Sequence, residues 1–204
     1  MAKNVLITAG PTRAYIDAVR YISNFATGRL GVEIAEEAYA REYNVKLVYG
    51  PGTAKVPGYI PKIDVETVDE MLKAVLDNIQ EADIFIANAA VLDFAPRRED
   101  RKIKSNAEKL VVEFYATPKI IKEAKKAARA ETAFVLFKLG YKMKKEDLIA
   151  EARSYGGDIC VANDLSEIHG NKHHAYILTG NREIEVHTKR EIARKIFDCL
   201  EGKL

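Results

Sequence analysis

One segment near the start of the chain restricts the possible fold more than any other. Residues 5–7 are the apolar run Val-Leu-Ile, the break Gly10-Pro11 follows closely, and helical spacing of apolar residues begins near Gly28. A continuous apolar run is typical of a strand buried on both faces of a parallel sheet. Open α/β sheets bind ligands at the carboxyl ends of such strands. We therefore expect a ligand site between this strand and the helix.

The residues just before that helix have the composition of an anion-binding turn. Ser23, Asn24, Thr27 and Gly28 lie there. The first backbone amides of a helix have no partner within the helix, and the helix dipole is positive at this end. A phosphate group can accept hydrogen bonds from these amides. The turn therefore predicts phosphate binding.

Strands and helices alternate along the rest of the chain. We expect strands at 45–49, 63–65, 83–87, 109–115, 134–137 and 159–162, and helices at 68–80, 118–130, 144–155 and 190–200. This alternation predicts a doubly wound, mostly parallel, Rossmann-like α/β sheet. The segments 175–178 and 184–187, turning at Gly180-Asn181, predict a C-terminal β-hairpin extension. We expect residues 1–204 to form a single domain.

Composition excludes several classes of function. The net charge of +2 gives no basic surface for nucleic acid. No apolar run approaches the ~18–20 residues of a membrane-spanning helix, and we expect a cytoplasmic location without membrane contact. Cys160 and Cys199 stand far apart, without zinc-finger or disulfide spacing. His169, His173 and His174 lack a convincing ligand set, so we expect a solvated loop there and no dedicated metal site.

Six short motifs then occur in order along the chain. They are TAGPTR, VRYISNFATGRLG, NAAVLDF, RKIKS, TPKII and ANDLS. With them the chain resembles phosphopantothenoylcysteine synthetase, the ligase of coenzyme A biosynthesis, across nearly its whole length. This family often occurs fused behind a flavin-dependent decarboxylase domain, so the resemblance implies a separate phosphopantothenoylcysteine decarboxylase as partner. It also implies a homodimer.

The resemblance implies a two-step ligation. The carboxylate of 4′-phosphopantothenate attacks the α-phosphate of a nucleoside triphosphate, which binds with Mg²⁺, and pyrophosphate leaves. The amine of cysteine then captures the acyl-nucleotide and releases the nucleoside monophosphate. Such chemistry needs charge neutralisation and positioning more than a protein nucleophile. We expect CTP as the nucleotide, with ATP as the alternative.

Two residues match the family's catalytic positions. Asn24 matches its catalytic asparagine, whose amide can donate to a developing oxyanion. A turn or helix-cap role for Asn24 is the alternative. Lys102 matches the lysine of a mobile flap that reaches the triphosphate. A solvated charge run is the alternative for Lys102, because charged residues surround it.

Further positions match the family's binding residues. Asp93 would bind the ribose, or else cap a helix. Arg20 would clamp the pantothenate phosphate across a dimer interface, or else form a surface salt bridge. Asn163 and Asp164 would border the substrate, or else cap the following turn. The full set expected to bind nucleotide is Gly10, Ser23, Thr27, Gly28, Ala89, Ala90, Asp93, Lys104, Pro118 and Phe137.

The chain departs from the family pattern at two positions. Gly140 stands where members carry an acidic residue, and Ser105 stands where bacterial members carry another lysine. Two other classes of function stay open at this stage. A Rossmann-type NAD(P)-dependent oxidoreductase would explain the sheet, although Gly10-Pro11-Thr12 breaks the glycine fingerprint expected after the first strand. A non-catalytic nucleotide-binding module would need no flap lysine.

Overall fold

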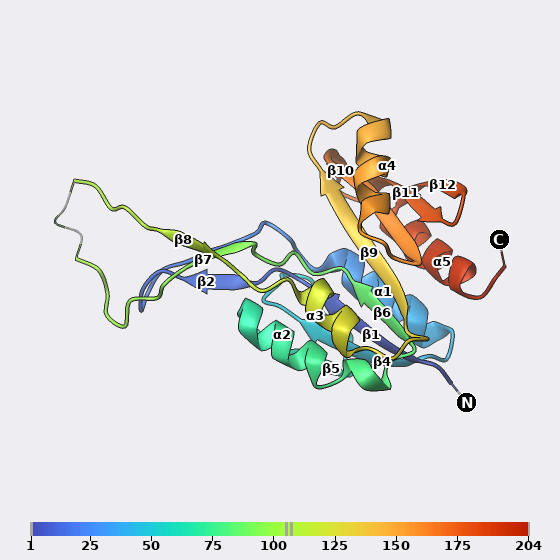
Figure 1. Cartoon of the computed structure of the whole chain (residues 1–204), viewed down its shortest axis with the longest axis horizontal. Coiled ribbons are helices and arrows are strands. Elements are labelled where there is room, and N and C mark those ends of the chain that lie inside the picture. Colours follow the sequence, from blue (N-terminus) through green and yellow to red (C-terminus); the bar gives the residue numbers. More distant parts are fainter. Residues whose placement is uncertain (1, 105, 107, 204) are drawn as a thin grey trace.

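An eight-stranded sheet forms the centre of the computed structural model, which describes residues 2–104, 106 and 108–203 (Figure 1). Its strands are β1 (Asn4–Ala9), β4 (Asn44–Tyr49), β5 (Lys62–Asp64), β6 (Ile84–Ala87), β9 (Ala133–Gly140), β10 (Ile159–His169), β11 (Lys172–Thr179) and β12 (Arg182–Thr188). Their order across the sheet is β12-β11-β10-β9-β6-β1-β4-β5. Only the pairs that involve β11 are antiparallel.

The order of the parallel strands is that of a doubly wound sheet. From β1 the chain moves outward to β4 and β5, and it then returns to the other side of β1 to add β6, β9 and β10. The direction of winding therefore reverses between β1 and β6, where neighbouring connections leave the sheet on opposite faces and open a crevice. The predicted Rossmann-like fold is confirmed.

Helices cover both faces of the sheet. One face is covered by α1 (Arg29–Ala40) and α5 (Lys189–Leu200), and the other by α2 (Val68–Leu76), α3 (Ile120–Ala127) and α4 (Lys145–Ser154), with a 3₁₀ turn η1 (Ile79–Glu81) after α2. Ile7 packs into one core and its neighbour Leu6 into the other. Burial on both sides explains the unbroken apolar run at the start of the chain.

Two helices are shorter than predicted. The helix expected at 68–80 ends at Leu76, and the helix expected from Pro118 begins at Ile120, because Lys119 is its N-cap. Pro118 therefore precedes the helix and is not its first residue. Within the described residues, no helix combines the length and the apolarity needed to cross a membrane.

The C-terminal hairpin is confirmed and is part of a longer antiparallel meander. Strand β10 continues past its predicted end at residue 162 as far as His169, turns at 170–171 and pairs with β11. The solvated loop predicted for the histidines is therefore wrong, because His173 and His174 lie within β11. Asn163 and Asp164 do not cap a turn at the end of β10; they lie buried within it.

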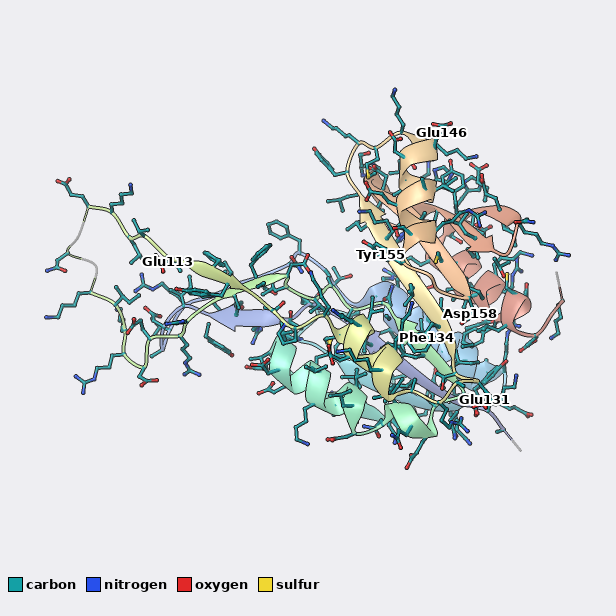
Figure 2. All side chains as sticks on the ribbon, in the orientation of Figure 1. Glu113, Glu131, Phe134, Glu146, Tyr155 and Asp158 are labelled. Carbon is teal, nitrogen blue, oxygen red and sulfur yellow. The ribbon has the colours of Figure 1, made fainter. Side chains whose placement is uncertain are left out.

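A long arm projects from the sheet and was not predicted. It comprises residues 13–23, which contain β2 (Arg13–Tyr15) and β3 (Tyr21–Ser23), and residues 94–116, which contain β7 (Phe94–Pro96) and β8 (Phe114–Ala116). Each pair of strands is antiparallel, and the strand predicted at 109–115 is reduced to the last of these segments. Figure 2 marks Glu113 on this arm, far from the labelled residues of β9 and α4.

Candidate active site

The crevice between β1 and β6 is closed at its base by hydrogen bonds between two loops. Ala90 N donates to Gly10 O at 2.9 Å, and Thr12 N donates to Ala90 O at 3.2 Å. The hydroxyl of Thr12 accepts from Leu92 N at 3.0 Å. The sequence analysis expected Gly10, Ala89 and Ala90 to face one cleft, and the structure brings these loops together. Thr12, fully buried, was not foreseen as the residue that joins them.

Asn24 lies at this crevice. Its side-chain Nδ2 donates to the carbonyl oxygen of Ala90 at 3.0 Å, and the hydroxyl of Ser23 donates to the carbonyl of Thr12 at 2.9 Å. Asn24 does not cap α1, because the N-cap residue is Gly28. The helix-cap alternative for Asn24 is therefore wrong. Its amide retains one N–H and its carbonyl oxygen for other partners.

The first turn of α1 is open to an anion. Gly28 has φ +80°, and a Cβ on it would lie 2.7 Å from Tyr49 Oη. Gly28 offers no side chain to cap the helix, and the hydroxyl of Thr27 accepts from Arg29 N at 3.3 Å. No acidic residue occupies the first turn. A Cβ at Gly31 would lie 2.2 Å from the Cβ of Ala9, so this glycine lets the helix approach β1 closely. The amides of this turn and the helix dipole therefore favour negative charge beside the crevice.

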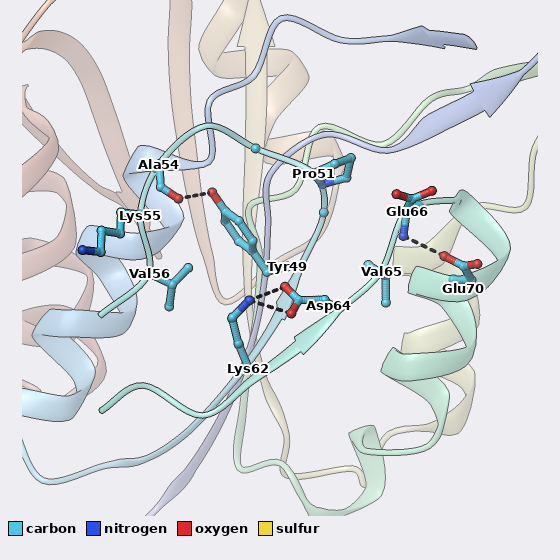
Figure 3. Close-up of a pocket in the computed structure, with 12 residues that line it drawn as sticks. Tyr49, Pro51, Ala54, Lys55, Val56, Lys62, Asp64, Val65, Glu66 and Glu70 are labelled. Carbon is cyan, nitrogen blue, oxygen red and sulfur yellow. Dashed lines mark hydrogen bonds and ion pairs between the residues drawn. The ribbon is translucent and has the colours of Figure 1, made fainter. Parts of the chain in front are cut away.

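A hollow of about 640 Å³ lies next to this turn, at the carboxyl ends of β4 and β5 (Figure 3). Tyr49 Oη donates to Ala54 O at 2.7 Å and so holds the loop that bounds it. Asp64, Glu66 and Glu70 contribute carboxylates to its lining, and Lys62 pairs with Asp64. Lys55 also lines the hollow, so its acidic and basic side chains largely offset each other, and its charge does not mark it as an anion site.

Arg20 is held by a buried acid that sequence reasoning missed. Asp17, with 0% exposure, accepts from Arg20 Nε at 3.0 Å and Nη2 at 2.6 Å. It also accepts from Ile103 N at 3.0 Å, and Arg20 Nη2 donates to Ile103 O at 2.9 Å. The hydrogen bonds from Arg20 hold the pKa of Asp17 well below its usual range. The salt bridge considered for Arg20 exists, and the hydrogen bonds of Arg20 and Asp17 to Ile103 join the two halves of the arm.

Lys102 lies beside this junction, because it precedes Ile103 in the chain. Lys102 and Lys104 are exposed on the arm, and neither forms an ion pair within residues 2–104, 106 and 108–203. Ser105 lies outside the described residues. Both lysines flank Ile103, whose carbonyl accepts a hydrogen bond from Arg20, so they lie on the arm and outside the β1–α1 turn.

Asp93 forms an ion pair that was not expected. Its Oδ1 accepts from Lys119 Nζ at 2.5 Å, and both side chains are exposed. Asp93 begins no helix, so the cap alternative is wrong.

Phe137 of β9 follows Leu136, which pairs with Ala87 at the end of β6. It therefore lies near the same end of the sheet as the crevice.

Asp164 holds the loop after β9. Its carboxylate accepts from Met143 N at 2.8 Å and from Ser166 N at 2.8 Å. Burial opposes its ionisation, but these bonds and that of the Ser166 hydroxyl lower the pKa of Asp164 to about 2.

A Cβ at Gly140 would lie 2.8 Å from Met143 Sδ and 2.9 Å from a methyl of Leu148. A larger side chain at Gly140 would therefore require the ends of the Met143 and Leu148 side chains to shift.

Replacing Asp164 by Asn should lower stability at neutral pH. Losing hydrogen bonds to a charged group should reduce the free energy of unfolding by about 1.5–3 kcal/mol. The pKa of Asp164 is lower in the folded chain than its ordinary 3.8, so its stabilisation is complete above about pH 4 and lost as pH falls towards 2. Thermal unfolding at pH 7 and pH 2 measures this. The Asp164→Asn deficit should shrink in acid, whereas Asp100→Asn, at an exposed position, should match the wild type.

Comparison with known proteins identifies the family. The model of the DNA/pantothenate metabolism flavoprotein C-terminal domain matches residues 1–203. The chain belongs to this family. It is 38% identical over 213 residues to the coenzyme A biosynthesis bifunctional protein CoaBC of Thermococcus kodakarensis, which covers 99% of this chain and 52% of that protein. The corresponding protein of Escherichia coli K12 is 42% identical over 122 residues, 58% of this chain and 30% of that protein. The chain thus spans about half the length of the Thermococcus kodakarensis relative.

Several solved structures share the fold over nearly the whole chain. The DNA/pantothenate metabolism flavoprotein from Streptococcus pneumoniae superposes with a TM-score of 0.91 at 26% identity, and each chain is covered completely. The C-terminal domain of a CoaBC protein superposes with a TM-score of 0.81 at 30% identity and covers 98% of this chain and 95% of that one. A Cab2 variant bound to phosphopantothenate-cysteine shares the fold at 18% identity, with a TM-score of 0.80 and coverage of 98% and 87%.

Proposed function

We propose that this chain is a phosphopantothenate–cysteine ligase that acts through an acyl-nucleotide. The observation that carries the proposal is the hydrogen bond of Asn24 to Ala90 beside the open first turn of α1, at the point where the sheet reverses its winding. This arrangement supports the proposal, because the amide of Asn24 and the first turn of α1 would lie at the end of the sheet where such folds bind ligands. Family membership supports the same conclusion, since its bifunctional relatives take part in coenzyme A biosynthesis.

The residues divide the work between activation and capture. The α1 turn would bind phosphates of the nucleotide, and Lys102 would neutralise charge as pyrophosphate leaves. Mg²⁺ would arrive with the triphosphate and offset its charge, since this ion is held largely by phosphates and water. The exposed carboxylate of Asp93, on the loop after β6, would accept hydrogen bonds from the ribose hydroxyls. Asn24 would stabilise the oxyanion that forms as the amine of cysteine attacks the acyl-nucleotide.

We further propose that two copies of the chain assemble through the arm. Several large apolar side chains are exposed on it, which a lone chain would leave in water: Val19, Tyr21, Phe94, Leu110, Val111, Phe114 and Tyr115. Phe94 and Phe114 lie on the same side of the β7–β8 ribbon, because Phe114 pairs with Pro96, two residues from Phe94. An arm packed on a second copy would carry Arg20 and Lys102 towards the crevice of that copy.

The purified chain should therefore be a dimer, and changing the arm should break it. Phe94→Asp combined with Phe114→Asp puts two charges on the exposed ribbon and should yield monomers, because burying unpaired charges is costly. Light scattering at several micromolar concentrations measures the mass. Leu76→Asp, at an exposed apolar residue of α2, is the matched control and should stay dimeric. A monomeric wild type at every concentration contradicts the assembly and the role of Arg20 across it.

One assay tests the reaction and the nucleotide together. The chain is incubated with 4′-phosphopantothenate, Mg²⁺ and each of the four ribonucleoside triphosphates, with and without cysteine. We expect pyrophosphate release with CTP, dependent on phosphopantothenate, and phosphopantothenoylcysteine only when cysteine is present. The product would be the substrate of a flavin-dependent decarboxylase. Absence of pyrophosphate with every triphosphate contradicts the proposal, and a preference for ATP contradicts the choice of nucleotide.

A further inference from the structure

A second cluster of ligand-forming side chains lies on the C-terminal meander. His174 extends from β11, and Glu185 and His187 extend from β12. One ligand atom from each of these three residues lies within 4.8 Å of the others. Glu167 of β10 joins them, and we call these four residues the meander cluster. Strands β9 and β10 separate it from β6, so it is distinct from the proposed active site.

Strand pairing explains why these side chains meet. Glu185 and His187 are two residues apart on β12 and so point to the same face. Tyr176 pairs with Glu185, and His174 lies two residues before Tyr176 on that same face. The irregular register between Lys172 and Ala175 brings His174 next to His187, with ring centroids 5.2 Å apart and planes 16° apart. The ligand atoms are thus set by paired backbone and not by a loose loop.

The hydrogen bonds of His174 point to one particular arrangement. Its Nδ1 lies 2.5 Å from Glu167 Oε2, and its Nε2 lies 2.7 Å from Glu185 Oε1. Ligating histidines in metal sites characteristically donate their second ring N–H to a carboxylate, which fixes the tautomer and raises the basicity of the ligating nitrogen. Glu167 stands in this place relative to His174. Nε2 would then direct its in-plane lone pair towards the side of the ring where Glu185 lies.

We propose that the meander cluster binds a divalent ion of the Zn²⁺ type. The ligands are His174 Nε2, a carboxylate oxygen of Glu185 and one ring nitrogen of His187, with Glu167 as the outer partner of His174. Two imidazoles and one carboxylate suit Zn²⁺, which takes nitrogen and oxygen ligands in tetrahedral sites and can keep water in the fourth position. Mg²⁺ prefers oxygen ligands in octahedral geometry and fits this set poorly. The bound ion would join β11 to β12, the edge strand of the sheet.

An ion-paired arrangement of His174 with Glu167 and Glu185, which we call the charge clamp, accounts for only part of the geometry. A protonated His174 could donate to both Glu167 and Glu185 without a metal. That arrangement gives no role to His187, whose ring is stacked on His174, and a charge on both rings would be unfavourable. Metal binding uses both imidazoles and both carboxylates. The side chains of Glu167 and Glu185 are 48% and 51% exposed, which leaves a path for the ion to enter.

The test uses the full chain, stripped with chelator and titrated with ZnCl₂ in a calorimeter. We expect one ion per chain with a Kd below about 100 μM, and roughly 10- to 100-fold weaker binding when Glu167→Gln removes the outer partner. His187→Gln removes a ligand and should abolish this binding. His169→Gln is the matched control, because His169 is an exposed histidine of the same meander outside the cluster. Circular dichroism verifies that each variant is folded.

Two further readouts complete the test. Co²⁺ in place of Zn²⁺ should give the intense visible absorption of a tetrahedral site, which Mg²⁺ in excess should not remove. Zn²⁺ at about 100 times its Kd should raise the melting temperature by about 5–10 °C, reversibly with EDTA. Undiminished Zn²⁺ binding by His187→Gln overturns the proposal. A wild type without stoichiometric binding at about 1 mM metal also overturns it and leaves the charge clamp.

Discussion

The Asn24→Asp variant is expected to release pyrophosphate but to accumulate the acyl-nucleotide. In the proposed reaction the α1 turn, Lys102 and Mg²⁺ would support activation of the triphosphate, so the first step should survive in this variant. Capture by cysteine places negative charge on the acyl oxygen, where Asn24 would donate a hydrogen bond and a carboxylate would oppose it. Losing such a donor costs about 100- to 1,000-fold in rate. Mass spectrometry of the quenched reaction detects the intermediate, and a coupled assay measures pyrophosphate.

The fold of the Asn24→Asp variant must be checked, because the substitution removes a hydrogen bond between two loops. Asn24 Nδ2 donates to Ala90 O at 3.0 Å, and an aspartate would place two oxygens in repulsive contact. Nucleotide binding, measured by calorimetry, shows whether the crevice is intact. Asn181→Asp makes the same change at an exposed turn and should leave turnover unchanged. Normal product formation by Asn24→Asp contradicts the assigned role, and so does retained nucleotide binding without any pyrophosphate release.

Lys102→Gln should fold normally and turn over about 10- to 100-fold more slowly. A charge-assisted contact to a phosphate is worth ~1.5–3 kcal/mol, and that amount of transition-state stabilisation corresponds to this loss of rate. Stability should not change, because the side chain is exposed on the arm and packs into no core. Steady-state kinetics and thermal unfolding measure the two effects separately.

A matched variant distinguishes this role from general loss of positive charge. Lys109→Gln removes an exposed lysine from the same half of the arm but outside the flap motif, and it should keep the wild-type rate. If both variants lose activity equally, the arm attracts substrate through its overall charge. A wild-type rate for Lys102→Gln would show that this lysine has no part in the reaction.

The local pattern of the sequence was enough to predict the sheet, most of its helices and which loops meet at one end of the sheet. Apolar runs such as 5–7 identify strands buried on both faces, and helical spacing after Gly28 identifies α1. The turn at Gly180-Asn181 identifies the hairpin. These features depend on residues within a few positions of one another. Gly10 and Ala90 could be placed at one crevice because strand ends meet at one edge of a parallel sheet.

Only the tertiary structure decided which residues that are distant in the sequence contact one another. Asp17 binds the amide of Ile103 from 86 positions away, and no local pattern marks this pair. The short strands of the arm lack the apolar periodicity of buried strands, because they pair outside the core. Gly140 is packed against the ends of the Met143 and Leu148 side chains, which come from the following loop and from α4. The meander cluster exists because β10, β11 and β12 pair in one particular register. A sequence specifies which face of a strand is buried, but contacts between distant residues form only when packing selects one arrangement of all the strands.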